Sequence, residues 1–92
     1  MNPDLAQKID PLLGQILERD PPEKVPIEVI VQTTDGLKSE DRRMVENLGG
    51  KIKADLHIVN SYSADLAPEA IEAMAMSERV VRIYYDAPVK AF

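Results

Sequence analysis

The sequence predicts an α+β fold whose elements follow the order strand, helix, strand, strand, helix, strand. Three observations lead to this prediction. Four short segments alternate between apolar and polar residues or are rich in β-branched residues, and two segments between them repeat apolar residues at helical spacing. Glycine, proline and asparagine separate the segments. The 92 residues suffice for one small domain, and no cysteine is available for a disulfide.

Residues 1–24 are predicted to form a helical leader and a proline-rich linker ahead of that unit. Asp10-Pro11 suits an N-cap and first helical position, and Asp20-Pro21-Pro22 ends the helix, which therefore covers about residues 11–19. An exposed apolar stripe would favour association, so we expect this helix to dock on the domain. The stripe consists of Leu5, Ile9, Leu12, Leu13, Ile16 and Leu17.

The main unit, residues 25–92, begins with a β-branched strand over residues 25–32. A turn follows, and Ser39 is the expected N-cap of the first helix, with acidic residues in its first turn. Gly49-Gly50 supplies the helix stop. The residues expected to face the core are Ile27, Val29 and Val31 on the strand and Leu37, Met44, Val45 and Leu48 on the helical segment.

The second half repeats the pattern. Residues 51–59 are predicted to be the second strand, residues 62–66 the third and residues 79–85 the fourth. Pro68 opens a helix that runs to about Met76. Ile52, Ala54, Leu56 and Ile58 are expected to share one face of the second strand, and Tyr62, Ala64 and Leu66 alternate along the third. Ile71, Met74 and Ala75 of the helix are expected to face inward.

These elements in this order predict a ferredoxin-like βαββαβ sandwich, in which four antiparallel strands carry two helices on one face. The N-terminal helix is an extension of that unit. The opposite face of the sheet is then left to meet water or a partner. The fold alone says little about function.

Composition argues against several classes of partner. Eleven basic and sixteen acidic residues give a net charge of −5 without a basic stripe, so we expect neither nucleic acid nor an anionic membrane as a partner. An RNA-recognition domain would carry stacking aromatics on its central strands, where this chain has Tyr62 alone. No apolar run approaches the ~20 residues that cross a bilayer.

No combination of residues predicts catalysis. His57 is the single histidine, and we expect it on the polar face of the second strand as a solvated side chain. The sequence suggests no nucleophile–base pair, and its carboxylates lack the spacing of a metal loop. Gly49-Gly50 ends a helix instead of opening one, so it is not a phosphate loop. We therefore predict that the chain is not an enzyme and has no cofactor or metal site.

The C-terminal tail, residues 87–92, is the unusual feature. Pro88 keeps it out of a helix, and Val89-Lys90-Ala91-Phe92 alternates in a way suited to binding as an added strand. Asp86 before it is an anion that suits the N-terminus of a helix on another protein. On physical grounds alone, a disordered terminus explains such a segment equally well, although the tail has few disorder-promoting residues and ends in an aromatic.

Three segments together resemble the propeptide and inhibitor family of subtilisin-like serine proteases. They are Gly49-Gly50-Lys51-Ile52, the run from Ile58 to Leu66, and the run from Val80 to Val89. Members of that family show a helix ending in a glycine pair, an apolar-Asn-x-aromatic-Ser-Ala segment and a closing Val-x-x-Val-x-x-Asp pattern. The similarity covers residues 25–92, and the N-terminal helix is similar to a leader that some bacterial subtilases carry.

The resemblance implies a propeptide that acts as intramolecular chaperone and inhibitor of a zymogen. The helix-free face of its sheet would pack on surface helices of the protease. Asp86 would cap their N-termini alone, because Tyr84 and Tyr85 replace the acidic residues of the best-known members. The tail from Pro88 to Phe92 would lie product-like in the cleft. A secreted precursor would carry a signal peptide before residue 1 and the protease after Phe92.

Two alternatives stay open at this point. One is a free-standing subtilisin inhibitor of the same fold. The other is a ferredoxin-like interaction or dimerisation module whose open sheet face pairs with itself, and whose association would not depend on residues 87–92.

Overall fold

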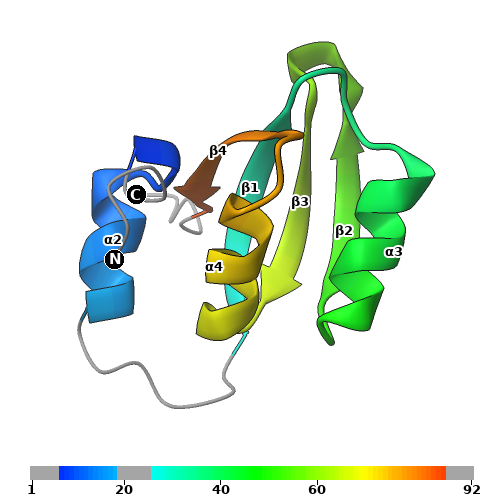
Figure 1. Ribbon diagram of the computed structural model, residues 1–92. Coiled ribbons are helices and arrows are strands. Elements are labelled where there is room, and N and C mark those ends of the chain that lie inside the picture. The colour runs from blue at the N-terminus through cyan, green and yellow to red at the C-terminus, as the bar shows by residue number, and fades with distance from the viewer. Residues whose placement is uncertain (1–6, 19–25, 87–92) are drawn as a thin grey trace, which may run out of the picture.

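The computed structural model describes residues 7–18 and 26–86, and its helices and strands follow the predicted order (Figure 1). The N-terminal part holds helix α2. The main unit then runs through four strands, two α-helices and a short 3-10 helix, η1. The bounds are α2 Pro11–Glu18, β1 Ile27–Thr33, α3 Ser39–Asn47, β2 Lys51–Leu56, η1 His57–Val59, β3 Ser61–Leu66, α4 Pro68–Ala75 and β4 Val80–Tyr85.

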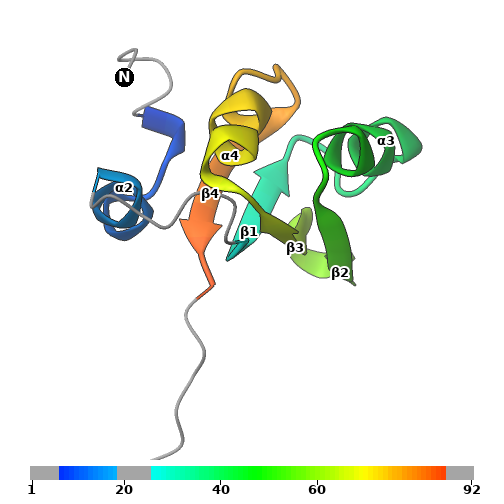
Figure 2. The ribbon, with the colours of Figure 1, turned by 90° about the horizontal axis from the view of Figure 1, so that it is seen from below.

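The strands form one sheet in the order β2-β3-β1-β4, and each neighbouring pair is antiparallel. Helices α3 and α4 cover one face, while α2 lies beside β4 at the edge (Figure 2). The predicted ferredoxin-like α+β fold is confirmed. Within the part of the chain that the structure describes, no helix covers the opposite face of the sheet.

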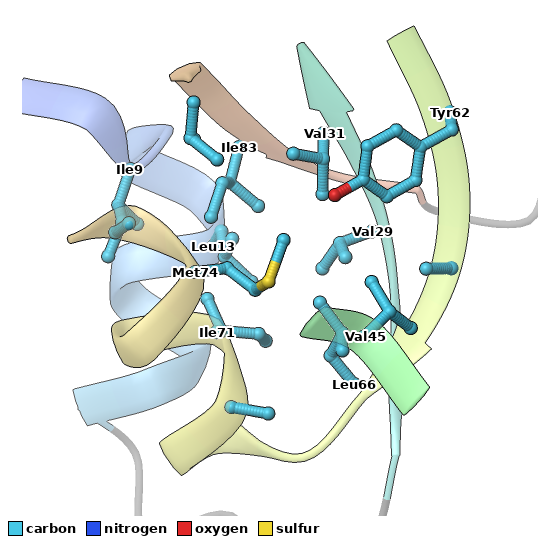
Figure 3. Close-up of a cluster of buried hydrophobic side chains, with 14 residues drawn as sticks. Ile9, Leu13, Val29, Val31, Val45, Tyr62, Leu66, Ile71, Met74 and Ile83 are labelled. Carbon is cyan, nitrogen blue, oxygen red and sulfur yellow. The ribbon is translucent and has the colours of Figure 1, made fainter. Parts of the chain in front are cut away.

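The core lies between the sheet and the helices (Figure 3). Alternate residues of β1 and β3 point into it, as the period-two pattern predicts. Leu13 of α2 is also fully buried, so the N-terminal helix docks as its apolar stripe predicts. The fully buried apolar side chains are Leu13, Val29, Val31, Val45, Tyr62, Ala64, Leu66, Ile71, Met74, Ala75 and Ile83.

The second strand is shorter than predicted. It ends at Leu56, and residues 57–59 form η1, so His57 does not lie on a strand. The register of β2 against β3 shifts between Ile52 and Ala54, which breaks the expected alternation. Ile58, expected to share a strand face with Ile52 and Leu56, lies outside the strand and is 88% exposed. Residues 57–59 turn away from the strand direction as η1. This short helix ends at Asn60, which adopts a left-handed conformation that asparagine tolerates well.

Helix α3 begins differently from the prediction. Lys38 is the N-cap, and Ser39 is the first helical residue. The cap depends on Asp41, whose carboxylate accepts a hydrogen bond of 2.8 Å from the Lys38 amide. This is the reciprocal half of a capping box, with the acid three residues after the cap. Asp41 is buried, and its charge is compensated by the guanidinium group of Arg79.

Tyr62 gives a first prediction, because its ring extends from β3 into the core instead of onto the open face (Figure 3). Its hydroxyl has no hydrogen-bond partner among the described residues, and burial raises its pKa. A buried unsatisfied hydroxyl costs about 1–3 kcal/mol. We therefore expect Tyr62→Phe to raise the free energy of unfolding by up to about 1 kcal/mol in urea titrations. A loss of stability would show that the hydroxyl is hydrogen-bonded in solution.

Candidate functional site

The open face of the sheet is the surface that the described helices leave free. Strand pairing arranges the residues of this face in three rows that run across the strands. The middle row has apolar character, and Tyr84 and Ile30 lie side by side there because their backbones pair. By register, the row nearest the end of β4 holds Asp86, Glu28, Asp65 and Lys51, the middle row holds Tyr84, Ile30, Ser63 and Ala54, and the third row holds Arg82, Gln32, Ser61 and Leu56.

The row nearest the end of β4 is acidic. Glu28 and Asp65 are register partners, and like charges placed opposite each other destabilise a sheet. Lys53 compensates for this: its ammonium group pairs with Glu28 and lies 3.9 Å from Asp65. The hydrogen bond to Glu28, together with Asp65 and Asp86, raises the pKa of Lys53. The ammonium group of Lys53 therefore lies in the field of three carboxylates at this end of the face.

Asp86 continues the sheet for one residue past β4. Its amide donates a 3.0 Å hydrogen bond to the carbonyl of Glu28, so the ladder between β4 and β1 fixes its backbone. Its side chain is only half-buried. This arrangement leaves a carboxylate at a defined position on the rim of the open face.

The two tyrosines before Asp86 have different surroundings. Tyr84 lies on the open face, where the Arg82 guanidinium carbon is 5.7 Å from its ring centroid, within range of a cation–π contact. Tyr85 is partly buried against the core. Only Tyr84 is therefore available for contact with a partner on the open face.

An open groove of about 390 Å³ lies at the same end of the molecule. Side chains from α2, the start of β1 and the end of β4 line it, and two of them are carboxylates. Its lining residues are Ile16, Pro26, Ile27, Glu28, Tyr85 and Asp86. The groove thus joins the docked N-terminal helix to the acidic end of the sheet.

The rest of the predicted site lies outside the described residues. This applies to Pro88, Val89, Lys90, Ala91 and Phe92. Of the predicted site, the structure therefore places Asp86 alone. It adds Glu28, Lys53, Asp65 and Tyr84 around the open face, which alternation along the strands could have indicated.

A second polar cluster lies at the opposite end of the strands. Arg79 donates two hydrogen bonds to Asp41, from Nε at 2.9 Å and from Nη2 at 2.8 Å. It also bonds the carbonyl of Gly36 and pairs with Asp35 at 2.9 Å. The cluster joins the loop after β1, the start of α3 and the start of β4. Its hydrogen bonds and ion pairs hold these three segments together.

Comparisons with family models, with curated proteins and with solved structures find no match for this chain. Within residues 7–18 and 26–86, no helix is long and apolar enough to cross a bilayer. The same residues bring together no group of three or more histidine, aspartate or glutamate side chains that could hold a metal ion.

Proposed function

We propose that the chain is the propeptide of a secreted subtilisin-like serine protease and inhibits that protease through its open sheet face and its C-terminal tail. The observation that carries the proposal is the position of Asp86. Its backbone is fixed by Glu28 at the end of β4, its carboxylate lies on the rim of the open face, and the tail follows it directly.

The open face carries acidic and apolar side chains that would suit surface helices of a protease. Carboxylates favour helix N-termini, which carry partial positive charge and unpaired amides, and three of them gather at this end of the sheet. The neighbouring row offers the apolar surface of Ile30 and Tyr84. A helix laid across the face would meet acid at one end and apolar side chains beside it.

The proposal is tested by inhibition of a broad-specificity subtilisin with the full chain and with a chain lacking residues 89–92. We expect the shorter chain to bind at least about tenfold more weakly, a loss of about 1.4 kcal/mol, because it cannot add a strand in the cleft. Asp86→Asn should also weaken inhibition. Glu46→Gln is the matched control, because Glu46 is exposed on α3, on the covered side of the sheet.

Equal inhibition by the two chains would exclude the role of the tail. No inhibition by either chain would exclude the proposal if the chains also fail against a protease encoded beside them. The interaction module would then become the better explanation, and its self-association would have to survive removal of residues 87–92.

A further inference from the structure

Strand β4 would be an edge strand of the βαββαβ unit, but the N-terminal segment occupies part of that edge. Ile9 forms a parallel bridge with Ile83, and the Asp10 amide donates a 2.9 Å hydrogen bond to the Ile83 carbonyl. Lys8 adds a 3.0 Å bond from its ammonium group to the carbonyl of Ser77, just before β4. An unpaired edge is a site for unwanted strand pairing, and this segment covers it.

The same segment completes the core. Ile9 is 4% exposed and Leu13 is fully buried, and both belong to the core cluster, where Leu13 lies beside Ile83 and Met74 (Figure 3). Neither residue belongs to the βαββαβ unit. Removing the segment would therefore expose apolar side chains of β4 and α4 to water.

The attachment is nevertheless narrow. Helix α2 packs mainly on β4, and it has only eight residues. Isolated helices shorter than ~12–15 residues are marginal in water, so a detached α2 would unfold. Elements held by few contacts open locally at a lower free energy than global unfolding.

This segment also reaches the candidate site. Ile16 of α2 lines the groove that Tyr85 and Asp86 line from the other side. The bridge from Ile9 to Ile83 holds the outer edge of β4, whose last residue, Tyr85, directly precedes Asp86. The strand before Asp86 is therefore held by β1 on one side and by the N-terminal segment on the other.

We propose that residues 7–18 are a strap that holds β4 in place, and that inhibition ends when this strap detaches and the protease degrades the chain. The proposal rests on the proposed function. With the strap attached, β4 and Asp86 are held and the chain resists digestion by the protease it binds. With the strap detached, the edge and the core open, and the inhibitor is degraded.

The test is a reversible lock on the strap. Neighbouring strands lie about 4.8 Å apart, within the roughly 4.4–6.8 Å that a disulfide spans between Cα atoms. Ile9→Cys combined with Ile83→Cys therefore places two cysteines in register in a chain that has no others. The measurement is the time for which the full chain suppresses subtilisin, with the pair oxidised and with it reduced.

We expect the oxidised chain to remain inhibitory at least about tenfold longer than the reduced chain, because digestion follows the population of the open form. Equal lifetimes would overturn the proposal. Leu13→Ala should shorten the lifetime of the otherwise unmodified chain by a similar factor. Leu12→Ala, at a neighbouring position that is 49% exposed, should leave it unchanged.

Hydrogen exchange of the unmodified chain separates this proposal from the proposed function. The Asp10 amide should exchange at least about tenfold faster than the amide of Ala64 in the central strand β3, because strap opening precedes global unfolding. Equal rates would show that the strap opens only with the whole domain and would overturn its role as a switch. Absence of inhibition in both redox states, with fast exchange at Asp10, would instead overturn the proposed function.

Discussion

Arg79→Met is expected to lower the free energy of unfolding by about 3 kcal/mol. Asp41 is 4% exposed and forms two hydrogen bonds with the Arg79 guanidinium. Removing one partner of a buried ion pair leaves the other charge without compensation, which costs about 3–5 kcal/mol. Asp35 and Gly36 lose the same partner, so the loop after β1 loses its connection to β4. Urea titrations measure the change.

Two controls decide whether the pair itself is responsible. Arg43→Met removes an exposed arginine of α3 and should change stability by less than about 0.5 kcal/mol. Arg79→Met combined with Asp41→Asn removes both charges, keeps an oxygen acceptor for the Lys38 amide and should recover part of the loss, because no uncompensated charge then stays buried. A double variant less stable than Arg79→Met alone would show that packing, not charge, dominates.

The same cluster predicts a pH dependence. The hydrogen bond from Arg79 holds the pKa of the Asp35 carboxyl below its ordinary value of about 3.9. A lowered pKa in the folded state stabilises the fold above the unfolded pKa, and this stabilisation is lost as the pH falls through the folded pKa. The parent chain should therefore lose stability below about pH 4 more steeply than Arg79→Met. Parallel acid profiles would contradict this assignment.

The fold was predictable wherever local spacing decides it. Alternation along β1 placed Val29 and Val31 on one face, and both are core residues because the strand packs that face against the helices. The N-terminal stripe predicted docking for the same reason. Asp86 was also predictable, since it directly follows the last strand.

Other features depend on partners that lie far away in the sequence. Arg79 and Asp41 are 38 residues apart, and no local pattern joins them. The bridge between Ile9 and Ile83 joins the two ends of the described chain. Strand β2 was predicted, but its break in alternation was not, because the shift in register is set by its pairing with β3.

Gly50→Ala is expected to lower the free energy of unfolding by about 3 kcal/mol, near the upper end of the cost of overpacking. A Cβ atom at this position would lie 2.5 Å from Cδ2 of Leu66 and 2.7 Å from the carbonyl oxygen of Asp65. The carbonyl belongs to the backbone of β3 and cannot rotate away. The start of β2 would have to move, although the next residue, Lys51, pairs with Asp65.

Gly14→Ala is the matched control, because it places the same methyl group in α2 with nothing within 4 Å. Alanine in a helix interior is favoured over glycine by about 0.5–1 kcal/mol, so this variant should be more stable than the parent chain. Thermal or urea unfolding of the two variants therefore measures changes of opposite sign from one chemical substitution. A mild effect at Gly50 would show that β2 can shift without cost.

The glycine pair after α3 thus serves two physical purposes. Gly49 has φ +80° and supplies the left-handed turn that ends the helix, whereas Gly50 allows β2 to approach β3 closely. The second purpose bears on the candidate site. A displaced β2 would move Lys53 away from Glu28 and Asp65, and the acidic end of the open face would lose its compensating charge.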